Sequence, residues 1–324
     1  MAAIYDVERE PEAALSAAVA SLARGEAVVI PTETVYGLAA DATDPAAITA
    51  IYETKGRPRF NPLICHAANL DMAEEYAQFD PLSRKLALAY WPGPLTLVLP
   101  LKSGSAIHPL ATAGLSTVGV RVPAGFAGKL IKAFGKPLAA PSANTSGKIS
   151  PTTAQHVDDD LGEKVRVILD GGPARVGVES TIIKVEDGTV RLLRPGGLSV
   201  DDIERVTGRR VQRDLSHDAA IEAPGMLQSH YAPDAAMRLN ATDVQPGEAL
   251  INFANQKLAN AERATASFEL SRSGSLREAA ANLFSIMKQA DACGARTIAV
   301  APVPMEGLGE AINDRLARAA APRA

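Results

Sequence analysis

Residues 28–66 constrain this chain more than any other stretch; they read VVIPTETVYGLAADATDPAAITAIYETKGRPRFNPLICH. A short β-branched run at residues 28–30 stops at a proline and is followed by the polar turn Thr32-Glu33-Thr34. A helix is expected over residues 45–54, and the cationic sequence KGRPR at residues 55–59 ends it, because glycine and proline oppose helix continuation. A strand, a hydroxyl-bearing turn, a helix and a rigid cationic loop together indicate a site for a negatively charged ligand.

The composition is that of an ordinary globular chain. Its 324 residues, 47% hydrophobic and 22% charged, suffice for one large domain or two ordinary ones. The net charge of −4 argues against a surface devoted to nucleic acid, although a local basic cleft stays open. Cys65 and Cys293 are expected as buried free thiols, and the five histidines show no metal-ligand spacing. With no apolar run able to span a bilayer and no signal peptide, we expect a cytoplasmic protein.

Strand and helix patterns alternate along the chain, and several strands follow one another directly. This order predicts a twisted, mixed α/β sheet and not a fully parallel one. Polar sequence with prolines and no usable period predicts a linker over residues 208–235. The predicted organisation is an α/β domain over residues 1–207, that linker, and a smaller α/β domain over residues 236–324.

Two loops are candidates for phosphate binding, since the chain lacks both common glycine-rich phosphate motifs. One is the cationic loop Lys55-Gly56-Arg57. The other is the serine loop, residues 141–151, in which Ser142 and Asn144 offer a hydroxyl, an amide and free backbone N–H groups. Charge from the first and neutral donors from the second would suit a polyphosphate. The alternatives are a solvated cationic loop and a plain turn.

Arg121 lies within an otherwise apolar strand expected at residues 118–123. Burial of a guanidinium is costly unless an anion pairs with it, so a ligand carboxylate or phosphate is a natural partner; an internal salt bridge is the alternative. Thr34, His66, Thr117 and Ser180 fall at predicted strand ends, where polar groups converge on ligands in open α/β sheets. Carboxylates near strand ends, at residues 170 and 179, are candidates for holding Mg²⁺ or for ordinary turns.

Several short motifs occur in a fixed order along the chain. They are PTETVYGL at residues 31–38, KGRP at 55–58, NPL at 61–63, WPGPLT at 91–96, RVP at 121–123, PSAN at 141–144 and EST at 179–181. This pattern resembles the YrdC family. The sequence SHYAP at residues 229–233 and the C-terminal domain are similar to the longer, two-domain Sua5 form of that family.

The resemblance implies a YrdC-like α/β domain around a cationic cavity, a Rossmann-like C-terminal domain, and the activity of a threonylcarbamoyl-AMP synthase. Such an enzyme condenses L-threonine, bicarbonate and ATP, and a partner complex transfers the threonylcarbamoyl group of the product to adenosine 37 of tRNA, giving t6A.

The resemblance also implies the site residues. The implied catalytic tetrad is Lys55, Arg57, Ser142 and Asn144. The implied threonine site is Thr34, His66, Arg121, Ala140 and Ser180, with Arg121 on the carboxylate. ATP would contact the tetrad together with Asn61, Thr117, Ser150, Arg194 and Tyr231. Lys55 would neutralise phosphate charge beside a Mg²⁺ held mainly by ATP.

Three other functions compete with this one. An RNA-binding module is disfavoured by the acidic net charge and the 4% aromatic content, although weak tRNA binding stays open. An O-carbamoylating enzyme of hydrogenase maturation would need further domains, for which the chain has neither the cysteines nor the length. A regulatory sensor would bind ATP without turnover.

Overall fold

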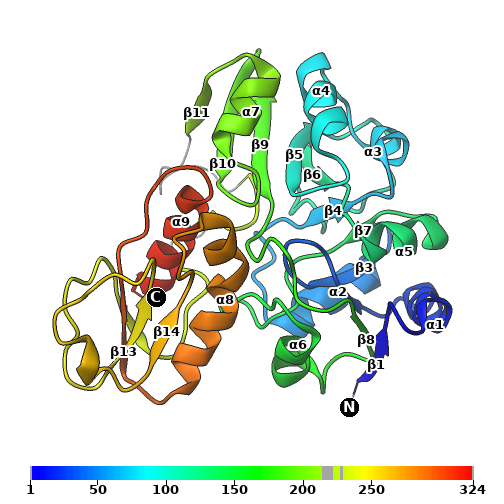
Figure 1. Cartoon of the computed structure of the whole chain (residues 1–324). Coiled ribbons are helices and arrows are strands. Elements are labelled where there is room, and N and C mark those ends of the chain that lie inside the picture. Colours follow the sequence, from blue (N-terminus) through cyan, green and yellow to red (C-terminus); the bar gives the residue numbers. More distant parts are fainter. Residues whose placement is uncertain (1, 214–221, 227–228, 323–324) are drawn as a thin grey trace.

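The computed structural model describes residues 2–213, 222–226 and 229–322, and these form two α/β lobes (Figure 1). The larger lobe is built on one 11-stranded sheet whose neighbours pair in both directions. Its strands, in spatial order, are β1 (Ala3–Asp6), β8 (Val167–Asp170), β2 (Val28–Ile30), β3 (Gly37–Asp41), β7 (Leu138–Ala139), β4 (Ile64–His66), β6 (Thr117–Arg121), β5 (Leu95–Pro100), β9 (Thr181–Glu186), β10 (Thr189–Arg194) and β11 (Val211–Arg213). The expected mixed sheet is confirmed.

Helices cover this sheet on both sides. They are α1 (Pro11–Ala23), α2 (Pro45–Lys55), α3 (Leu70–Tyr76), α4 (Pro81–Tyr90), α5 (Phe126–Phe134), α6 (Ala154–Leu161) and α7 (Val200–Thr207). Strand β2 shows the two-sided burial directly, because Val29 belongs to one hydrophobic cluster while Val28 and Ile30 belong to another. Successive side chains of a strand point to opposite faces, so a strand buried on both sides is apolar at every position.

Local sequence sets the position of Lys55 at the end of α2. The Asp44 carboxylate caps the helix by accepting a hydrogen bond from the Ala46 N–H (2.8 Å), and Pro45 occupies the first turn. Gly56 ends the helix in a left-handed conformation (φ 59°), which glycine adopts without steric penalty. Lys55 is therefore the last helical residue, and its side chain is buried.

The smaller lobe contains a four-stranded, entirely parallel sheet, confirming the Rossmann-like second domain. Its strands are β12 (Ala236–Arg238), β15 (Thr297–Val300), β13 (Glu248–Asn252) and β14 (Ser267–Glu269), with the short 3₁₀ helix η1 (Ala261–Arg263) and the helices α8 (Leu276–Ala292) and α9 (Gly309–Ala320). Figure 1 shows α8 and α9 on the side of this lobe that faces the larger one.

The two lobes share a hydrophobic core. Val35, Ile149 and Val178 of the larger lobe pack in one cluster with Leu283 and Phe284 of α8. The contact is close: a Cβ added to Gly177, whose φ is +76°, would lie 2.3 Å from the Ala280 carbonyl oxygen of α8. The smaller lobe is therefore in direct, close contact with the larger one at Gly177.

Several elements differ from the sequence-based expectation. Strand β3 was not expected, because its sequence GLAAD is rich in alanine and fully buried, and so shows neither strand propensity nor alternation. The short strands β1 and β12 and the helix α7 also lack a strong pattern. Strand β11 extends the first sheet to Arg213, past the predicted boundary at residue 207. Residues 214–221 and 227–228 of the predicted linker lie outside the described part of the chain.

Both cysteines are free: Cys65 is buried as expected, whereas Cys293 is only partly buried. Among the described residues, no helix is long and apolar enough to cross a membrane.

Replacing Gly177 by alanine should destabilise the protein through the contact between lobes. Gly188 is the matched control, because its φ is +73° and a Cβ there would meet no atom within 4 Å. Both substitutions place alanine in the left-handed region of backbone conformation, which costs about 1–2 kcal/mol of stability. Only Gly177→Ala adds steric overlap, worth about 1–3 kcal/mol more. Chemical denaturation measures the difference, and equal losses for the two variants would contradict the close packing.

Candidate functional site

A cavity lies between the strand ends of the large sheet and residues 224–225 and 230–231, which precede the smaller lobe. Its lining includes Thr34, Arg57, His66, Arg121, Ala140, Ser142, Glu179, Ser180, Arg194, Pro224, Gly225, His230 and Tyr231. The free space inside is about 50 Å³, against about 300–1,000 Å³ for typical ligand pockets. The structure is therefore a closed form, in which residues 224–225 and 230–231 occupy one side of the site.

Sheet register brings the polar side chains together. His66 ends β4 and is the register partner of Arg121, which ends the parallel neighbour β6. Ser180 immediately precedes β9, and its hydroxyl lies 2.7 Å from that of Thr96 on β5. Arg194 ends β10 and donates to the Ser180 carbonyl from Nη2 (2.9 Å) and Nε (3.2 Å). These side chains converge on one edge of the sheet, as the strand-end argument predicted.

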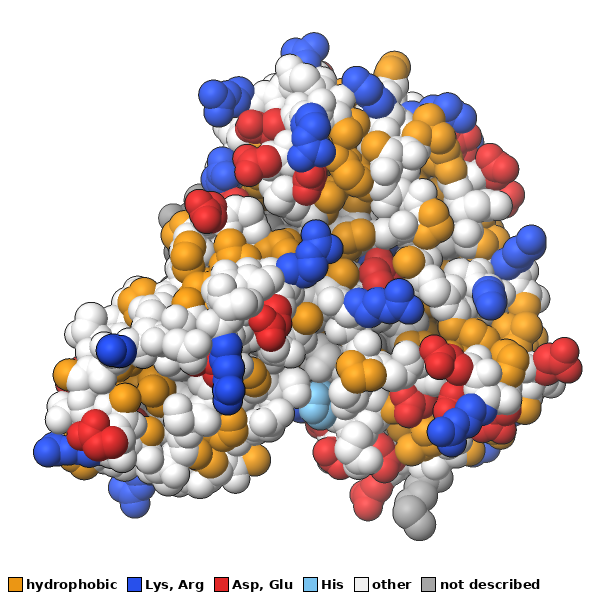
Figure 2. Space-filling model, in the orientation of Figure 1, with side chains coloured by type: hydrophobic (Ala, Val, Ile, Leu, Met, Phe, Trp, Pro, Cys, Tyr) orange, Lys and Arg blue, Asp and Glu red, His pale blue; other side chains and the backbone are white. Residues whose placement is uncertain are grey.

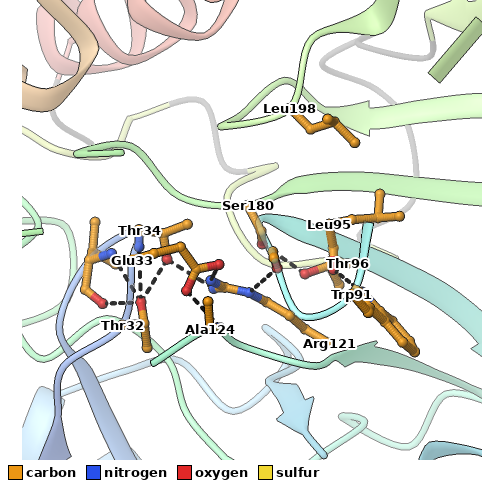
Figure 3. A network of polar contacts seen from close by, with 12 residues as sticks. Thr32, Glu33, Thr34, Trp91, Leu95, Thr96, Arg121, Ala124, Ser180 and Leu198 are labelled. Carbon is orange, nitrogen blue, oxygen red and sulfur yellow. Dashed lines mark hydrogen bonds and ion pairs between the residues drawn. The ribbon is translucent and has the colours of Figure 1, made fainter. Parts of the chain in front are cut away.

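Arg121 is buried, and each of its three guanidinium nitrogens donates a hydrogen bond (Figure 3). Its Nη2 donates to the Glu33 carboxylate (2.6 Å), its Nη1 to the Thr34 hydroxyl (2.9 Å) and its Nε to the Gly93 carbonyl (3.1 Å). Glu33 also accepts from the Ala124 N–H at 3.1 Å. The internal salt bridge, the alternative left open for this arginine, is thus present in the closed form, and Arg121 still borders the cavity.

The cationic loop and the serine loop are in direct contact. The Lys55 ammonium donates to the carbonyls of Ser142 (2.5 Å) and Asn144, and the Lys55 carbonyl accepts from the Ser146 N–H at 2.8 Å. Burial, reinforced by the nearby Arg57 charge, holds the pKa of Lys55 well below its usual value. The two loops expected from sequence to share a ligand therefore form one structural unit.

Arg57 and Asn61 extend this unit along the cavity wall. Arg57 donates to the carbonyls of Asn61 (3.2 Å) and Pro62 (2.9 Å), and burial lowers its pKa to about 10. The Asn61 side chain is 1% exposed, yet neither its amide nitrogen nor its carbonyl oxygen has a partner within the described structure. Buried polar atoms without partners are uncommon, and a water, an ion or a ligand can supply the missing partners.

Residues leading to the smaller lobe close the opposite side. A Cβ on Gly225 would lie 2.8 Å from Arg194 Cδ, so the chain passes directly over this arginine. Tyr231 is buried with a positive φ of 62°, and its ring packs on His230 and on Phe284 of α8. Burial lowers the pKa of His230 to about 3, so this imidazole is neutral near pH 7.

Glu179 links the cavity to the smaller lobe. Its carboxylate accepts from the Ser150 hydroxyl (2.6 Å) and from Arg315 Nε of α9 (2.8 Å). Burial alone would raise the pKa of Glu179, but the positive charges of Arg315 and Arg194, with the Ser150 hydrogen bond, lower it to about 2. The carboxylate is therefore ionised at every physiological pH.

Most of the predicted site residues are brought together. Those that line the cavity are Thr34, Arg57, His66, Arg121, Ala140, Ser142, Ser180, Arg194 and Tyr231. Lys55, Asn61, Asn144 and Ser150 lie directly behind this lining through the contacts above. Thr117 is the exception: it begins β6, at the far end of the strand from Arg121, about 13 Å away at ~3.3 Å per residue. The structure does not place Thr117 at this cavity.

Sequence reasoning missed two contributors. Glu33 was named only as part of a polar turn, and Arg315 was not singled out within the predicted C-terminal domain. The expectation of a carboxylate at a strand end was the available signal for Glu179. Asp170 ends β8, and its carboxylate accepts hydrogen bonds from the Tyr36 hydroxyl (3.1 Å) and the Gly172 N–H (2.9 Å). Within the described residues, no group of three His, Cys, Asp or Glu side chains could hold a metal ion.

The fold and the site define an α/β protein with buried cations and hydroxyls converging on one closed cavity, arranged to bind a small anionic ligand. Two family models match the chain: one described as "Telomere recombination" (Sua5, YciO and YrdC) over residues 20–196, the other as "Threonylcarbamoyl-AMP synthase, C-terminal domain" over residues 198–321. The chain belongs to the Sua5/YrdC family, in its two-domain form.

Full-length relatives agree with this assignment. The chain is 39% identical to a threonylcarbamoyl-AMP synthase of Pyrococcus abyssi, covering 96% of this chain and 95% of the relative. It is 40% identical to one of Bacillus subtilis, covering 97% and 94%. The crystal structure of P. abyssi Sua5 complexed with L-threonine superposes with a TM-score of 0.85 at 38% identity, covering 94% of each chain.

The low pKa of Glu179 predicts acid-sensitive stability. A carboxylate whose folded pKa is depressed contributes stability above its unfolded pKa of 4.5, and this is lost as pH falls toward its folded pKa of about 2. The contribution is on the order of 3 kcal/mol, at ~1.4 kcal/mol per pKa unit. Glu179→Gln should therefore flatten the fall in unfolding free energy between pH 4.5 and 2, while the exposed Glu163→Gln keeps the wild-type slope. Parallel curves for Glu179→Gln and wild type would contradict the assignment.

Proposed function

We propose that this chain is a threonylcarbamoyl-AMP synthase, catalysing the first step of t6A formation at position 37 of tRNA. L-threonine, bicarbonate and ATP give threonylcarbamoyl-AMP, pyrophosphate and water. In reaction class this is a nucleotidyl transfer, since the adenylyl group passes from pyrophosphate to a carbamate. The observation that carries the proposal is the contact between the Lys55 loop and the Ser142 loop beside a strand-borne arginine, within a member of this family.

Threonine is proposed to bind at the Arg121 end of the cavity. Thr34 donates to Thr32, because the Thr32 hydroxyl already donates to the Val35 carbonyl at 2.7 Å. The Thr34 oxygen is then the acceptor that holds Arg121 Nη1. An incoming carboxylate would take over part of the guanidinium that Glu33 neutralises in the closed form. His66 would pack beside it as a neutral imidazole, since burial and the adjacent Arg121 charge lower its pKa to about 3.

ATP is proposed to bind between the two loops. Its phosphates would replace the backbone carbonyls that now accept from Lys55 and Arg57, and Arg194 would add a third cation to the same wall. A triphosphate carries enough negative charge to balance buried cations, whereas neutral carbonyls offset little of their burial cost. Mg²⁺ would arrive with the phosphates and neutralise their charge, with Ser142 and Asn144 nearby as oxygen donors.

The proposed chemistry requires mainly positioning. The deprotonated amine of threonine adds to CO₂ or bicarbonate and forms a carbamate. A carbamate oxygen then attacks the α-phosphorus in line, forming the new P–O bond as the bond to pyrophosphate breaks. Lys55 and Arg57 would stabilise the charge that develops on the leaving pyrophosphate, and buried, preorganised cations do this without reorganising solvent.

The segment formed by residues 224–225 and 230–231 is proposed to act as a lid. It covers one side of the cavity in the closed form, whose free space of about 50 Å³ is too small for ATP, so ATP can enter only after the segment moves. Once closed again, it would exclude water from the carbamoyl-adenylate, a hydrolytically labile product. A partner transferase complex would then receive the product, consistent with a cytoplasmic enzyme. Figure 2 shows acidic and basic side chains interspersed over the face drawn, without a broad basic patch, so weak RNA contact is a secondary role at most.

The activity itself is tested by incubating the purified protein with ATP, labelled bicarbonate and each amino acid in turn. The expected result is a threonine-dependent adenylate, identified by mass, with release of pyrophosphate. ATP binding without any adenylate would favour a nucleotide sensor. Salt-sensitive RNA binding without threonine-dependent turnover would favour an RNA-binding module.

Arg121→Lys tests the threonine site. A lysine keeps the charge but cannot reproduce the planar fork that contacts Glu33, Thr34 and a ligand carboxylate together. The KM for threonine should rise about tenfold or more, equivalent to ~1.4 kcal/mol, with a smaller change in the KM for ATP. Arg175→Lys, at an exposed arginine, is the matched control. An unchanged KM for threonine in Arg121→Lys would remove Arg121 from the threonine site.

Tyr231→Ala tests the lid. Loss of the buried ring should leave a cavity open to water, so a smaller fraction of the ATP consumed should appear as intact adenylate. The ratio of threonylcarbamoyl-AMP to pyrophosphate measures this coupling. A wild-type ratio in Tyr231→Ala would exclude a role for this residue in shielding the product.

A further inference from the structure

The smaller lobe contributes one fully buried charged side chain to the wall of the site. Arg315 of α9 is 0% exposed and is the largest fully buried residue by volume among those described. Its Nε donates to Glu179 (2.8 Å), its Nη2 to the Pro195 carbonyl (3.0 Å) and its Nη1 to the neighbouring Asp314. Every nitrogen of the guanidinium thus has an acceptor, as burial of this group requires.

Three contacts of Arg315, with Glu179, Pro195 and Tyr231, lead to residues implied in ATP binding. Through Glu179 it reaches Ser150, whose hydroxyl donates to the other oxygen of the same carboxylate (2.6 Å). Through the Pro195 carbonyl it fixes the turn that begins at Arg194. Its guanidinium carbon lies 5.1 Å from the centroid of the Tyr231 ring, a cation–π contact with the proposed lid.

The buried contacts of Arg315 differ from the other ion pair that α9 makes with the larger lobe. A second ion pair also joins this helix to the larger lobe, between Glu310 and Arg213 (2.7 Å), but the Arg213 side chain is 51% exposed and neither residue borders the cavity. Simple attachment of the lobes is served by that exposed pair and by the shared apolar core. Arg315, in contrast, is buried and contacts Glu179, the turn that begins at Arg194, and Tyr231 of the lid, so it can set the positions of these groups at the site.

We propose that Arg315 is a positioning residue for ATP, through which the smaller lobe orients Ser150, the Arg194 turn and Tyr231 as one set. The proposal rests on the proposed function for the identity of the nucleotide. Arg315 does not border the cavity, so it acts through these neighbours and not on the substrate. The smaller lobe thereby forms part of the nucleotide site, in addition to supporting the lid.

The test compares Arg315→Met, which removes the charge at similar length, with Arg315→Lys and with Glu310→Gln as the matched control at the exposed pair. Titration with a non-hydrolysable ATP analogue should show affinity reduced at least tenfold in Arg315→Met. Arg315→Lys should fall between, because it restores charge opposite Glu179 but not the bond to Pro195. Steady-state assays should show the KM for ATP raised by the same factor, with the KM for threonine and the control variant within twofold of wild type.

A double variant establishes the route and guards against misfolding. Glu179→Gln/Arg315→Met leaves no buried charge opposite an absent partner, so it should fold even where Arg315→Met does not. Adding Arg315→Met to Glu179→Gln should lower ATP-analogue affinity less than threefold further, because the two residues act as a unit. The proposal would be overturned if the two substitutions lowered ATP-analogue affinity additively. It would also be overturned if Arg315→Lys and the double variant both bound the analogue with near-wild-type affinity, or if binding of ATP and of threonine were weakened equally. Analogue binding by a wild-type protein that makes no adenylate would refute the proposed function and leave this test intact.

Discussion

The buried ammonium of Lys55 is the interaction on which the rest of the site depends. Taking a cation out of water is costly, and here the partners are two backbone carbonyls of the serine loop and no carboxylate. The helix cap at Gly56 fixes where this charge lies, and the serine loop is held against it. The charge is thus positioned before any nucleotide arrives, with partners that a more strongly negative group can displace.

Two other buried cations of the closed form are balanced differently, by carboxylates. Glu33 neutralises Arg121, and Glu179 neutralises Arg315, so these two buried guanidinium groups each have a carboxylate beside them. These internal acids keep the unliganded site stable without filling it. Substrate binding then becomes an exchange of partners in which the lid moves and the phosphates and the threonine carboxylate replace internal groups.

Much of this arrangement could be predicted from sequence because its determinants are local. The signals that end α2 and form the cationic loop lie close together in the chain, at Pro45 and Gly56. Arg121 could be recognised because the other residues of its strand, β6, are mostly apolar. The pairing of Glu33 with Arg121 could not be predicted, because it joins residues 88 positions apart and depends on how β2 and β6 are placed.

Strand β3 was missed because a buried alanine-rich strand shows no alternation of apolar and polar residues. Arg315 was missed because the strand-end and loop signals that mark a site are absent from a C-terminal helix, and only the packing of α9 on the larger lobe brings it to Glu179. Thr117 lies at the opposite end of β6 from Arg121, and its predicted contact with ATP stays a prediction.

The central claim is that the cationic loop and the serine loop hold one triphosphate while Arg121 holds threonine beside it. A crystal structure with a non-hydrolysable ATP analogue and L-threonine tests this most directly. The account predicts phosphate oxygens within hydrogen-bonding distance of Lys55 and Arg57, with the threonine carboxylate on Arg121 and the lid displaced or reclosed over both. A nucleotide bound elsewhere, with Lys55 still donating to the carbonyls of Ser142 and Asn144, would contradict it.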